Sequence, residues 1–210
     1  KKIWWADLNP PEYKAKDGKP IKYPAAEGPS EINSTPVFYK NRVYVGTGQD
    51  PEHGEGVGRF VCLDATKTGN LTESGILWEY RGIKRSISTC GIDPATGLLF
   101  IGDFSGFVHC LDAETGKPYW VYDMKAHMWG STMVADGKVY VGDEDGDFVV
   151  LKADKVLKVL SETNLGAPVY STPVVANGTM YVASQTHLYA IGANAVPVSS
   201  DKPRDIQIKN

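Results

Sequence analysis

The chain has 210 residues, of which 42% are hydrophobic, 22 are glycine and 13 are proline. This composition suits one turn-rich globular domain with a substantial core and excludes a disordered chain. The net charge is −3 and both signs are scattered, so the basic patch of a nucleic-acid binder is missing. No apolar run approaches the roughly 20 residues that cross a bilayer, and we expect no membrane span.

One four-residue pattern, in the order apolar, aromatic, β-branched and small, occurs four times. It stands at Val43–Gly46, Leu99–Gly102, Val139–Gly142 and Met180–Ala183, and a Ser-Thr pair precedes each copy. The last three copies are spaced 40 and 41 residues apart, whereas the first interval is 56 residues. Repeats of about 40–45 residues form four-stranded propeller blades or helical repeats, and these short β-branched segments exclude helices. The chain is therefore predicted to be an all-β propeller of four-stranded antiparallel blades.

The second repeat predicts the plan of one blade. Turn-forming residues separate its segments at Asp93–Gly97, Phe104–Gly106 and Ala113–Lys117. The four strands predicted between them are Ser86–Gly91, Leu98–Asp103, Phe107–Asp112 and Pro118–Tyr122. Pro118 is acceptable in the fourth strand because an outer strand can spare a hydrogen-bond donor.

The two ends of the chain predict incomplete blades. Residues 1–33 hold an outer strand of a preceding blade, at Lys2–Asp7, and a long connection. Blades follow at 34–80, 86–124 and 129–160; the last, at 169–192, lacks its outer strand, and 193–210 form a tail. These strands equal four blades, either a ring closed by pairing Ile3–Ala6 with His187–Ile191, or part of a larger ring. We favour part of a seven- or eight-bladed ring, since four blades is the lower limit for propellers.

The segment Leu111–Trp120 reads Leu-Asp-Ala-Glu-Thr-Gly-Lys-Pro-Tyr-Trp. It resembles the signature of the PQQ-like, or quinoprotein-type, propeller repeat, and a looser copy begins at Leu63. The resemblance covers residues 32–192 and implies that the signature Trp docks between neighbouring blades. In quinone dehydrogenases of this type the cofactor lies on the axis between a Trp and a disulfide of adjacent cysteines, beside a bound calcium ion and a catalytic Asp.

Those chemical groups are incomplete in this sequence. Its three cysteines, Cys62, Cys90 and Cys110, are far apart, and Cys62 and Cys110 occupy the same repeat position as Ala190. We interpret them as small buried residues. We therefore expect neither PQQ nor calcium, and a fragment of a quinoprotein dehydrogenase stays as the alternative.

The 56-residue interval contains a glycine-rich insertion at residues 48–58. Its polar side chains, Asp50, Glu52, His53 and Glu55, suggest a metal or partner site, or solvated acids on an ordered loop. A partner site is favoured because long loops on a rigid scaffold commonly carry function, and no second His or Cys completes a metal set. The insertion joins a second and a third strand, at the end of the blade where His127 and Trp129 precede the third blade.

A run of alternating acids, Asp143, Asp145 and Asp147, resembles a calcium loop only superficially. It lacks the downstream Glu of an EF-hand and stands where each blade has a hairpin, so a turn is the preferred interpretation.

These observations predict a non-enzymatic propeller scaffold that binds a protein partner in a larger envelope or redox complex. The partner-binding candidates are Asp50, Glu52, His53, Glu55, His127 and Trp129. A small-ligand or metal-binding propeller is a further alternative. Because the resemblance includes exported bacterial assembly factors, we expect a periplasmic or equivalent extracytoplasmic location.

Overall fold

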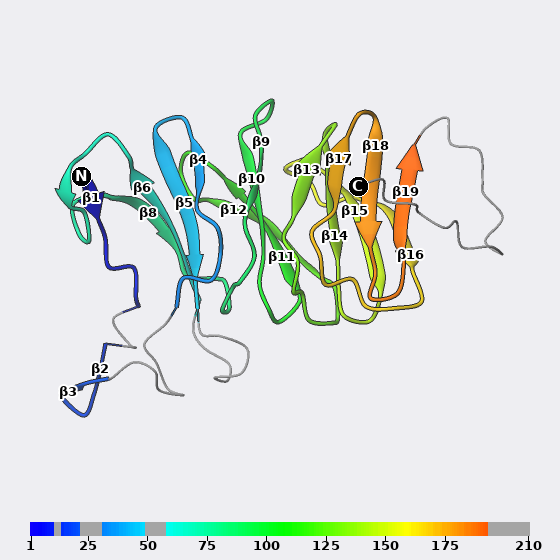
Figure 1. Cartoon of the computed structure of the whole chain (residues 1–210). Coiled ribbons are helices and arrows are strands. Elements are labelled where there is room, and N and C mark those ends of the chain that lie inside the picture. The colour runs from blue at the N-terminus through cyan, green and yellow to red at the C-terminus, as the bar shows by residue number, and fades with distance from the viewer. Residues whose placement is uncertain (11–13, 22–30, 49–57, 193–210) are drawn as a thin grey trace, which may run out of the picture.

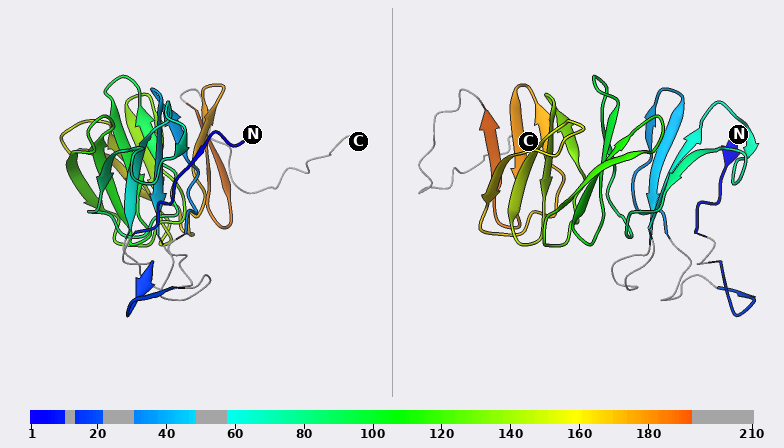
Figure 2. Two further views of the ribbon diagram at one scale, coloured as in Figure 1. Left: turned by 90° about the vertical axis from the view of Figure 1, so that its left-hand side faces the viewer. Right: turned by 180° about the vertical axis from the view of Figure 1, so that it is seen from behind.

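The computed structural model describes residues 1–10, 14–21, 31–48 and 58–192, and within them regular structure is entirely β-strand. Four antiparallel sheets, here called blades one to four, stand side by side in chain order (Figure 1). The predicted all-β propeller architecture is confirmed. The four blades form an open arc, with blade one and blade four at opposite ends in each broadside view (Figures 1 and 2).

Blades one to three each have four strands, and the strands of each blade are neighbours in the order of the chain. Blade one comprises β4 (Val37–Tyr39), β5 (Arg42–Thr47), β6 (Arg59–Asp64) and β8 (Ile76–Tyr80). Blade two comprises β9 (Gly91–Asp93), β10 (Leu98–Gly102), β11 (Phe107–Asp112) and β12 (Pro118–Asp123). Blade three comprises β13 (Met133–Ala135), β14 (Lys138–Gly142), β15 (Asp147–Lys152) and β16 (Val159–Asn164).

Blade four has three described strands, β17 (Val174–Ala176), β18 (Thr179–Ala183) and β19 (Leu188–Gly192). Two further pairs lie outside the blades. The strand β1 (Trp4–Trp5) runs parallel to β7 (Gly69–Asn70), a short strand between β6 and β8. The hairpin of β2 (Ala15–Lys16) and β3 (Lys19–Pro20) projects away from the sheets (Figure 1).

Local turn chemistry explains why the first hairpins of the blades close tightly. Asp136-Gly137 and Asn177-Gly178 each place two successive residues at positive φ, as a two-residue type I′ turn requires. The pair Asp17-Gly18 does the same between β2 and β3. The latter hairpin was not predicted from the sequence, although its Asp-Gly pair is the usual signal.

The first strand of blade two is shorter than predicted and lies further along the chain. In blade two β9 begins at Gly91, whereas the sequence predicted a strand over Ser86–Gly91. The strand begins later because the backbone N–H groups of Ser88 and Thr89 bond to side chains instead of a neighbouring strand. Ser88 N donates to Ser86 Oγ at 3.2 Å, and Thr89 N donates to Ser131 Oγ at 2.8 Å.

The repeated Ser-Thr pairs link successive blades through hydrogen bonds between side chain and backbone. Thr35 N donates to Thr89 Oγ1 (3.1 Å), and Thr89 N donates to Ser131 Oγ (2.8 Å). The series ends with Ser131 N donating to Thr172 Oγ1 (2.9 Å). The pairs therefore form a ladder that runs through all four blades.

The signature segment of blade two forms a turn that receives the neighbouring blade. The Asp112 carboxylate accepts the backbone N–H groups of Glu114 (3.0 Å) and Thr115 (2.9 Å). Gly116 follows with φ +74°, and a Cβ there would lie 2.5 Å from the ring of Trp78 in blade one. Glycine is required at this position by both its φ and the close approach of the Trp.

The tryptophan of blade two docks in the same direction, onto blade three. Trp120 Nε1 donates to the Asp154 carbonyl oxygen at 2.8 Å. In blades one and two, a tryptophan of the fourth strand pairs with a cysteine of the third strand, Trp78 with Cys62 and Trp120 with Cys110. At the equivalent position of blade three, Ser161 pairs with Val150. The contact between blades three and four therefore lacks the docking tryptophan. The contact between blades three and four is instead formed by a smaller hydrophobic cluster around Phe148, Val169 and Val182.

The N-terminal segment is an outer strand in its packing but is not paired with blade four. Gly69 N donates to the Ile3 carbonyl (3.0 Å), and Leu71 N donates to that of Trp5 (2.8 Å). Trp4, Ala6 and Leu8 pack against blade one, with Leu8 buried beside Val45 and Leu63. In the described structure, β1 and β19 do not pair, so the hypothesis of a single-chain closed ring is wrong.

Candidate functional site

Side chains from the connections of blades two, three and four form a continuous aromatic row along one edge of the arc. This is the edge at which the second and third strands of each blade are joined. The row consists of Phe104 and His127 with Trp129 and Tyr170, and two charged residues, Arg85 and Glu144, pack within it. Phe104 and Glu144 belong to the hairpins between the second and third strands of blades two and three. The other four belong to the connections that lead from one blade into the next.

Phe104 is the buried base of the row. Its ring centroid lies 4.6 Å from that of His127 and 4.9 Å from that of Trp129, which meets it edge-on. The Arg85 guanidinium lies 4.5 Å from the Phe104 centroid, and both residues are buried. Such cation–π and edge-to-face contacts fix the relative orientation of the rings. The base of the row is therefore a rigid support.

Glu144 holds the two predicted candidate residues together. Its carboxylate is 2.8 Å from His127 Nδ1 and accepts the Trp129 Nε1 hydrogen at 3.0 Å. Burial favours the neutral acid, but the hydrogen bonds from Trp129 and His127 outweigh burial and lower the pKa of Glu144. The carboxylate therefore stays ionised and orients both rings.

Trp129 and Tyr170 present the accessible surface of the row. Their centroids are 5.8 Å apart in an edge-on arrangement, and the residues are 40% and 46% exposed. Large aromatic side chains that are held in place but remain accessible are typical of protein-binding surfaces. The structure thus brings the two candidates His127 and Trp129 together and adds four residues that sequence analysis missed.

The insertion in blade one leaves and rejoins its sheet beside this row. Gly48 lies against the backbone of Arg85, and Gly58 lies against the carbonyl oxygen of Lys84, with no room for a side chain at either glycine. The predicted candidates Asp50, Glu52, His53 and Glu55 lie outside the described residues. Their chain flanks, however, contact the same segment that supplies Arg85 to the row.

The acidic run in blade three forms a hairpin. Asp143 is fully buried, and its Oδ1 accepts the backbone N–H groups of Asp145 (3.1 Å) and Asp147 (2.9 Å). Asp147 in turn accepts an amide hydrogen from Asn164 at 2.8 Å. Burial raises the pKa of the Asp143 carboxyl. Among the described residues, no group of three His, Cys, Asp or Glu side chains is arranged to hold a metal ion.

A buried polar group beneath the row escaped sequence analysis. His109 Nε2 lies 3.1 Å from Asp103 Oδ2, and its Nδ1 lies 3.2 Å from the Tyr80 hydroxyl. Asp103 also accepts the backbone N–H of Lys84 at 3.1 Å. Because Lys84 precedes Arg85, this buried group holds the connection on which the row is built.

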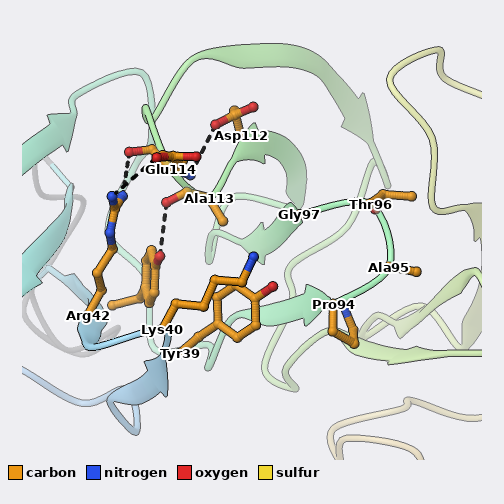
Figure 3. A pocket seen from close by; sticks show the side chains of 11 residues that line it. Tyr39, Lys40, Arg42, Pro94, Ala95, Thr96, Gly97, Asp112, Ala113 and Glu114 are labelled. Carbon is orange, nitrogen blue, oxygen red and sulfur yellow. Dashed lines mark hydrogen bonds and ion pairs between the residues drawn. The ribbon is translucent and has the colours of Figure 1, made fainter.

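The opposite edge of the arc has a polar pocket between blades one and two, with a volume of about 420 Å³ (Figure 3). Arg42 Nη1 donates to the Glu114 carbonyl (2.6 Å), and the Tyr44 hydroxyl donates to that of Ala113 (3.0 Å). These two bonds join β5 to the signature turn of blade two (Figure 3). Arg42 and Tyr44 in the pocket therefore connect blade one to blade two through these hydrogen bonds.

The cysteines do not provide the disulfide that the resemblance places against a quinone. Cys62, Cys90 and Cys110 are all free and buried. Burial raises the pKa of the Cys62 thiol to about 11, and those of Cys90 and Cys110 to about 12. They are thus neutral core residues, as expected, and the described residues do not fit the quinone pocket of that family.

In the part of the chain that the structure describes, no helix has the length and apolar character needed to cross a membrane.

Comparison with known proteins supports the repeat assignment. Residues 75–159 match the family model described as outer membrane protein assembly factor BamB. The quinohemoprotein alcohol dehydrogenase of Comamonas testosteroni is 28% identical over 110 residues, which are 45% of this chain and 15% of that protein.

Solved structures share the fold at low sequence identity. BamB from Moraxella catarrhalis has a TM-score of 0.56 at 18% identity, covering 74% of this chain and 41% of that chain. The computationally designed Ika4 protein has a TM-score of 0.59 at 15% identity, covering 77% of this chain and 92% of that chain. The chain thus spans less than half the length of these two natural proteins. Its blades identify the chain as a β-propeller protein, and residues 75–159 are the part that matches the family model.

Proposed function

We propose that this protein is a non-enzymatic scaffold that binds a protein partner through the aromatic row. The observation that carries the proposal is the arrangement of Trp129 and Tyr170, two accessible aromatic side chains on a buried, charge-oriented base. Aromatic residues in such settings contribute most of the binding energy at protein interfaces. The family model named for an assembly factor supports the same role.

The partner is proposed to belong to a larger envelope or redox complex, in a periplasmic or equivalent extracytoplasmic compartment. The two described flanks of the insertion, Gly48 and Gly58, contact the segment that carries Arg85. We therefore include Asp50, Glu52, His53 and Glu55 in the proposed contact region. Long loops held by a rigid scaffold are well suited to such contacts.

Site-specific photocrosslinking tests the proposal in cells that make the protein. A photoreactive phenylalanine analogue at position 129 is expected to give one discrete protein adduct. The matched control carries the analogue at Val156, which is 73% exposed but lies in the turn between β15 and β16. Tyr170→Ala, introduced with the probe at 129, is expected to reduce the adduct about thirtyfold, because an aromatic anchor at an interface contributes on the order of 2 kcal/mol. Equal adducts at 129 and 156 would contradict the proposal.

A second candidate function is that of a quinoprotein dehydrogenase, favoured by the sequence match to the Comamonas testosteroni enzyme. It requires a quinone site formed by groups outside the described residues, since the cysteines described above do not fit it. The full-length protein would then show quinone absorbance and calcium-dependent dye reduction. A protein without quinone absorbance or dye-reducing activity rules this candidate out.

A further inference from the structure

The pocket between blades one and two has the dimensions of a small-molecule site. Its volume of about 420 Å³ lies within the range of roughly 300–1,000 Å³ that is usual for such sites. Three turns line it: the hairpin that follows Tyr39, the turn Pro94–Gly97, and the signature turn of blade two (Figure 3). The lining is mainly polar, so a ligand bound there is expected to be polar as well.

The hairpin of blade one that lines the pocket differs from its counterparts in blades three and four. Its two central residues are Lys40 at φ +48° and Asn41 at φ +60°, whereas the other two hairpins use Asp136-Gly137 and Asn177-Gly178. A left-handed backbone is less favourable for lysine than for the Asp, Asn and Gly residues that usually fill such turns. Strained residues of this kind tend to be found at functional sites. Lys40 is therefore held at a strained position where it lines the pocket.

Two hydrogen-bond donors in the pocket are unused. The Tyr39 hydroxyl is buried and has no partner among the described residues. The Lys40 ammonium lies 5.1 Å from the centroid of the Tyr39 ring and forms no ion pair within the described part of the chain. Both groups point into the space between the signature turn and the turn Pro94–Gly97 (Figure 3). Because buried hydroxyls are nearly always hydrogen-bonded in folded proteins, this unused pair indicates a site for an acceptor.

The carboxylates that line the pocket are either occupied or free to turn away. The Asp112 carboxylate accepts two backbone N–H groups of the signature turn and lies 3.2 Å from the Tyr119 hydroxyl that donates to it. The Glu114 carboxylate is 3.6 Å from Arg42 Nη2, which is longer than a hydrogen bond, and its side chain is 81% exposed. The unused side-chain groups are therefore mainly donors, and those of Lys40 and Arg42 carry positive charge.

We propose that this pocket binds the anionic group, a carboxylate or a phosphate, of a small polar ligand. Lys40 and Arg42 supply the positive charge, and the Tyr39 hydroxyl donates a hydrogen bond to the same group. Hydrogen bonds between charged donors and carboxylate or phosphate oxygens are among the strongest in proteins. The pocket lies on the opposite edge of the arc from the aromatic row, and this inference does not rest on the proposed function.

Isothermal titration calorimetry of the full-length protein tests the proposal with two probes, inorganic phosphate and citrate. At least one probe is expected to bind, and the one that binds more tightly identifies the anionic group of the ligand. Lys40→Met is expected to weaken that binding about tenfold or more, because it removes a charge-assisted hydrogen bond. The matched control, Lys158→Met, removes an exposed lysine of blade three and is expected to leave binding unchanged.

Two further variants separate ligand binding from a structural role. Tyr39→Phe is expected to weaken binding of the same probe about tenfold and to leave the free energy of unfolding without the probe unlowered, since its hydroxyl has no partner in the described chain. Lys40→Asp combined with Asn41→Gly gives this hairpin the turn residues of blade three. That double variant is expected to abolish binding and to raise the midpoint of thermal unfolding, because the strain of the turn is relieved.

Failure of both probes to bind at concentrations up to about 10 mM would overturn the proposal. Binding that Lys158→Met weakens as much as Lys40→Met would overturn the assignment to this pocket. A Tyr39→Phe variant that binds as tightly as the wild type but is less stable would show that the hydroxyl is structural, and would overturn its role in binding.

Discussion

At the scale of single residues, equivalent positions in the repeat have different environments. Asp103 and Asp143 both follow the small residue that ends a second strand, and both are fully buried. Asp103 Oδ2 is within hydrogen-bond distance of the Lys84 N–H and of His109 Nε2. Asp143 Oδ2 finds no partner among the described residues. Identical turn chemistry thus leaves one carboxylate fully paired and the other with an unpaired oxygen.

Glu144 allows a residue-scale prediction about pH. Its hydrogen bonds from Trp129 and His127 lower its pKa in the folded chain, against the effect of burial. The stabilisation is therefore complete above the ordinary value of 4.5, and is lost as pH falls through the lower folded pKa. The Trp129 indole N–H resonance, assigned with Trp129→Phe, should shift with a midpoint below 4.5. Glu144→Gln should abolish that transition, and a midpoint above 4.5 would contradict the assignment.

At the scale of elements, blades are held together by a few repeated groups. The Ser-Thr ladder and the docking tryptophans each contact the next blade and no more distant one. Trp120 Nε1 reaches the Asp154 carbonyl, whereas Trp78 Nε1 is buried without a partner among the described residues. The two tryptophans therefore provide the same packing with and without a hydrogen bond.

This difference predicts unequal costs for the same substitution. Trp120→Phe and Trp78→Phe both remove part of an indole ring, but only Trp120→Phe removes a hydrogen bond. Trp120→Phe is expected to lower the free energy of unfolding by about 1 kcal/mol more than Trp78→Phe, the usual net value of one hydrogen bond. Urea unfolding followed by circular dichroism measures the difference. Equal losses would show that the indole hydrogen bond contributes nothing to docking.

The strand pattern was predictable from the sequence, whereas the assembly of the site was not. The second and third strands follow from repeated alternation and from turn residues such as Gly137 and Gly178. The pairing of β1 with β7 depends on how one blade is placed against the next, which no local pattern encodes. The sequence likewise assigned Phe104 and Glu144 only to turns, because their contacts with His127 and Trp129 also depend on how the blades are placed. Aligning the hairpins would have signalled them, because both follow the Asp of their repeat.

At the scale of the whole molecule, the burial of the strands differs from blade to blade along the arc. The strands β10 and β11 of blade two are almost entirely buried between two neighbours. In blade four, β17 is exposed throughout and β19 is largely exposed. Stability in proteins built from repeats depends on contacts between nearest neighbours, so a terminal repeat with one neighbour is the least stable.

Hydrogen exchange measures this gradient. Backbone amides of β18 and β19 are expected to exchange roughly tenfold faster or more than those of β10 and β11, because their protecting contacts come from one side only. Uniform exchange across the four blades would contradict the gradient.

The absence of a docking tryptophan at Ser161 has a mechanical consequence. When the molecule is pulled between β1 and β19, the contacts between successive blades carry the load in series. The contact between blades three and four lacks the large ring that Trp78 and Trp120 supply to the other two. Blade four is therefore expected to detach first under tension, and Ser161 marks the place where the arc breaks.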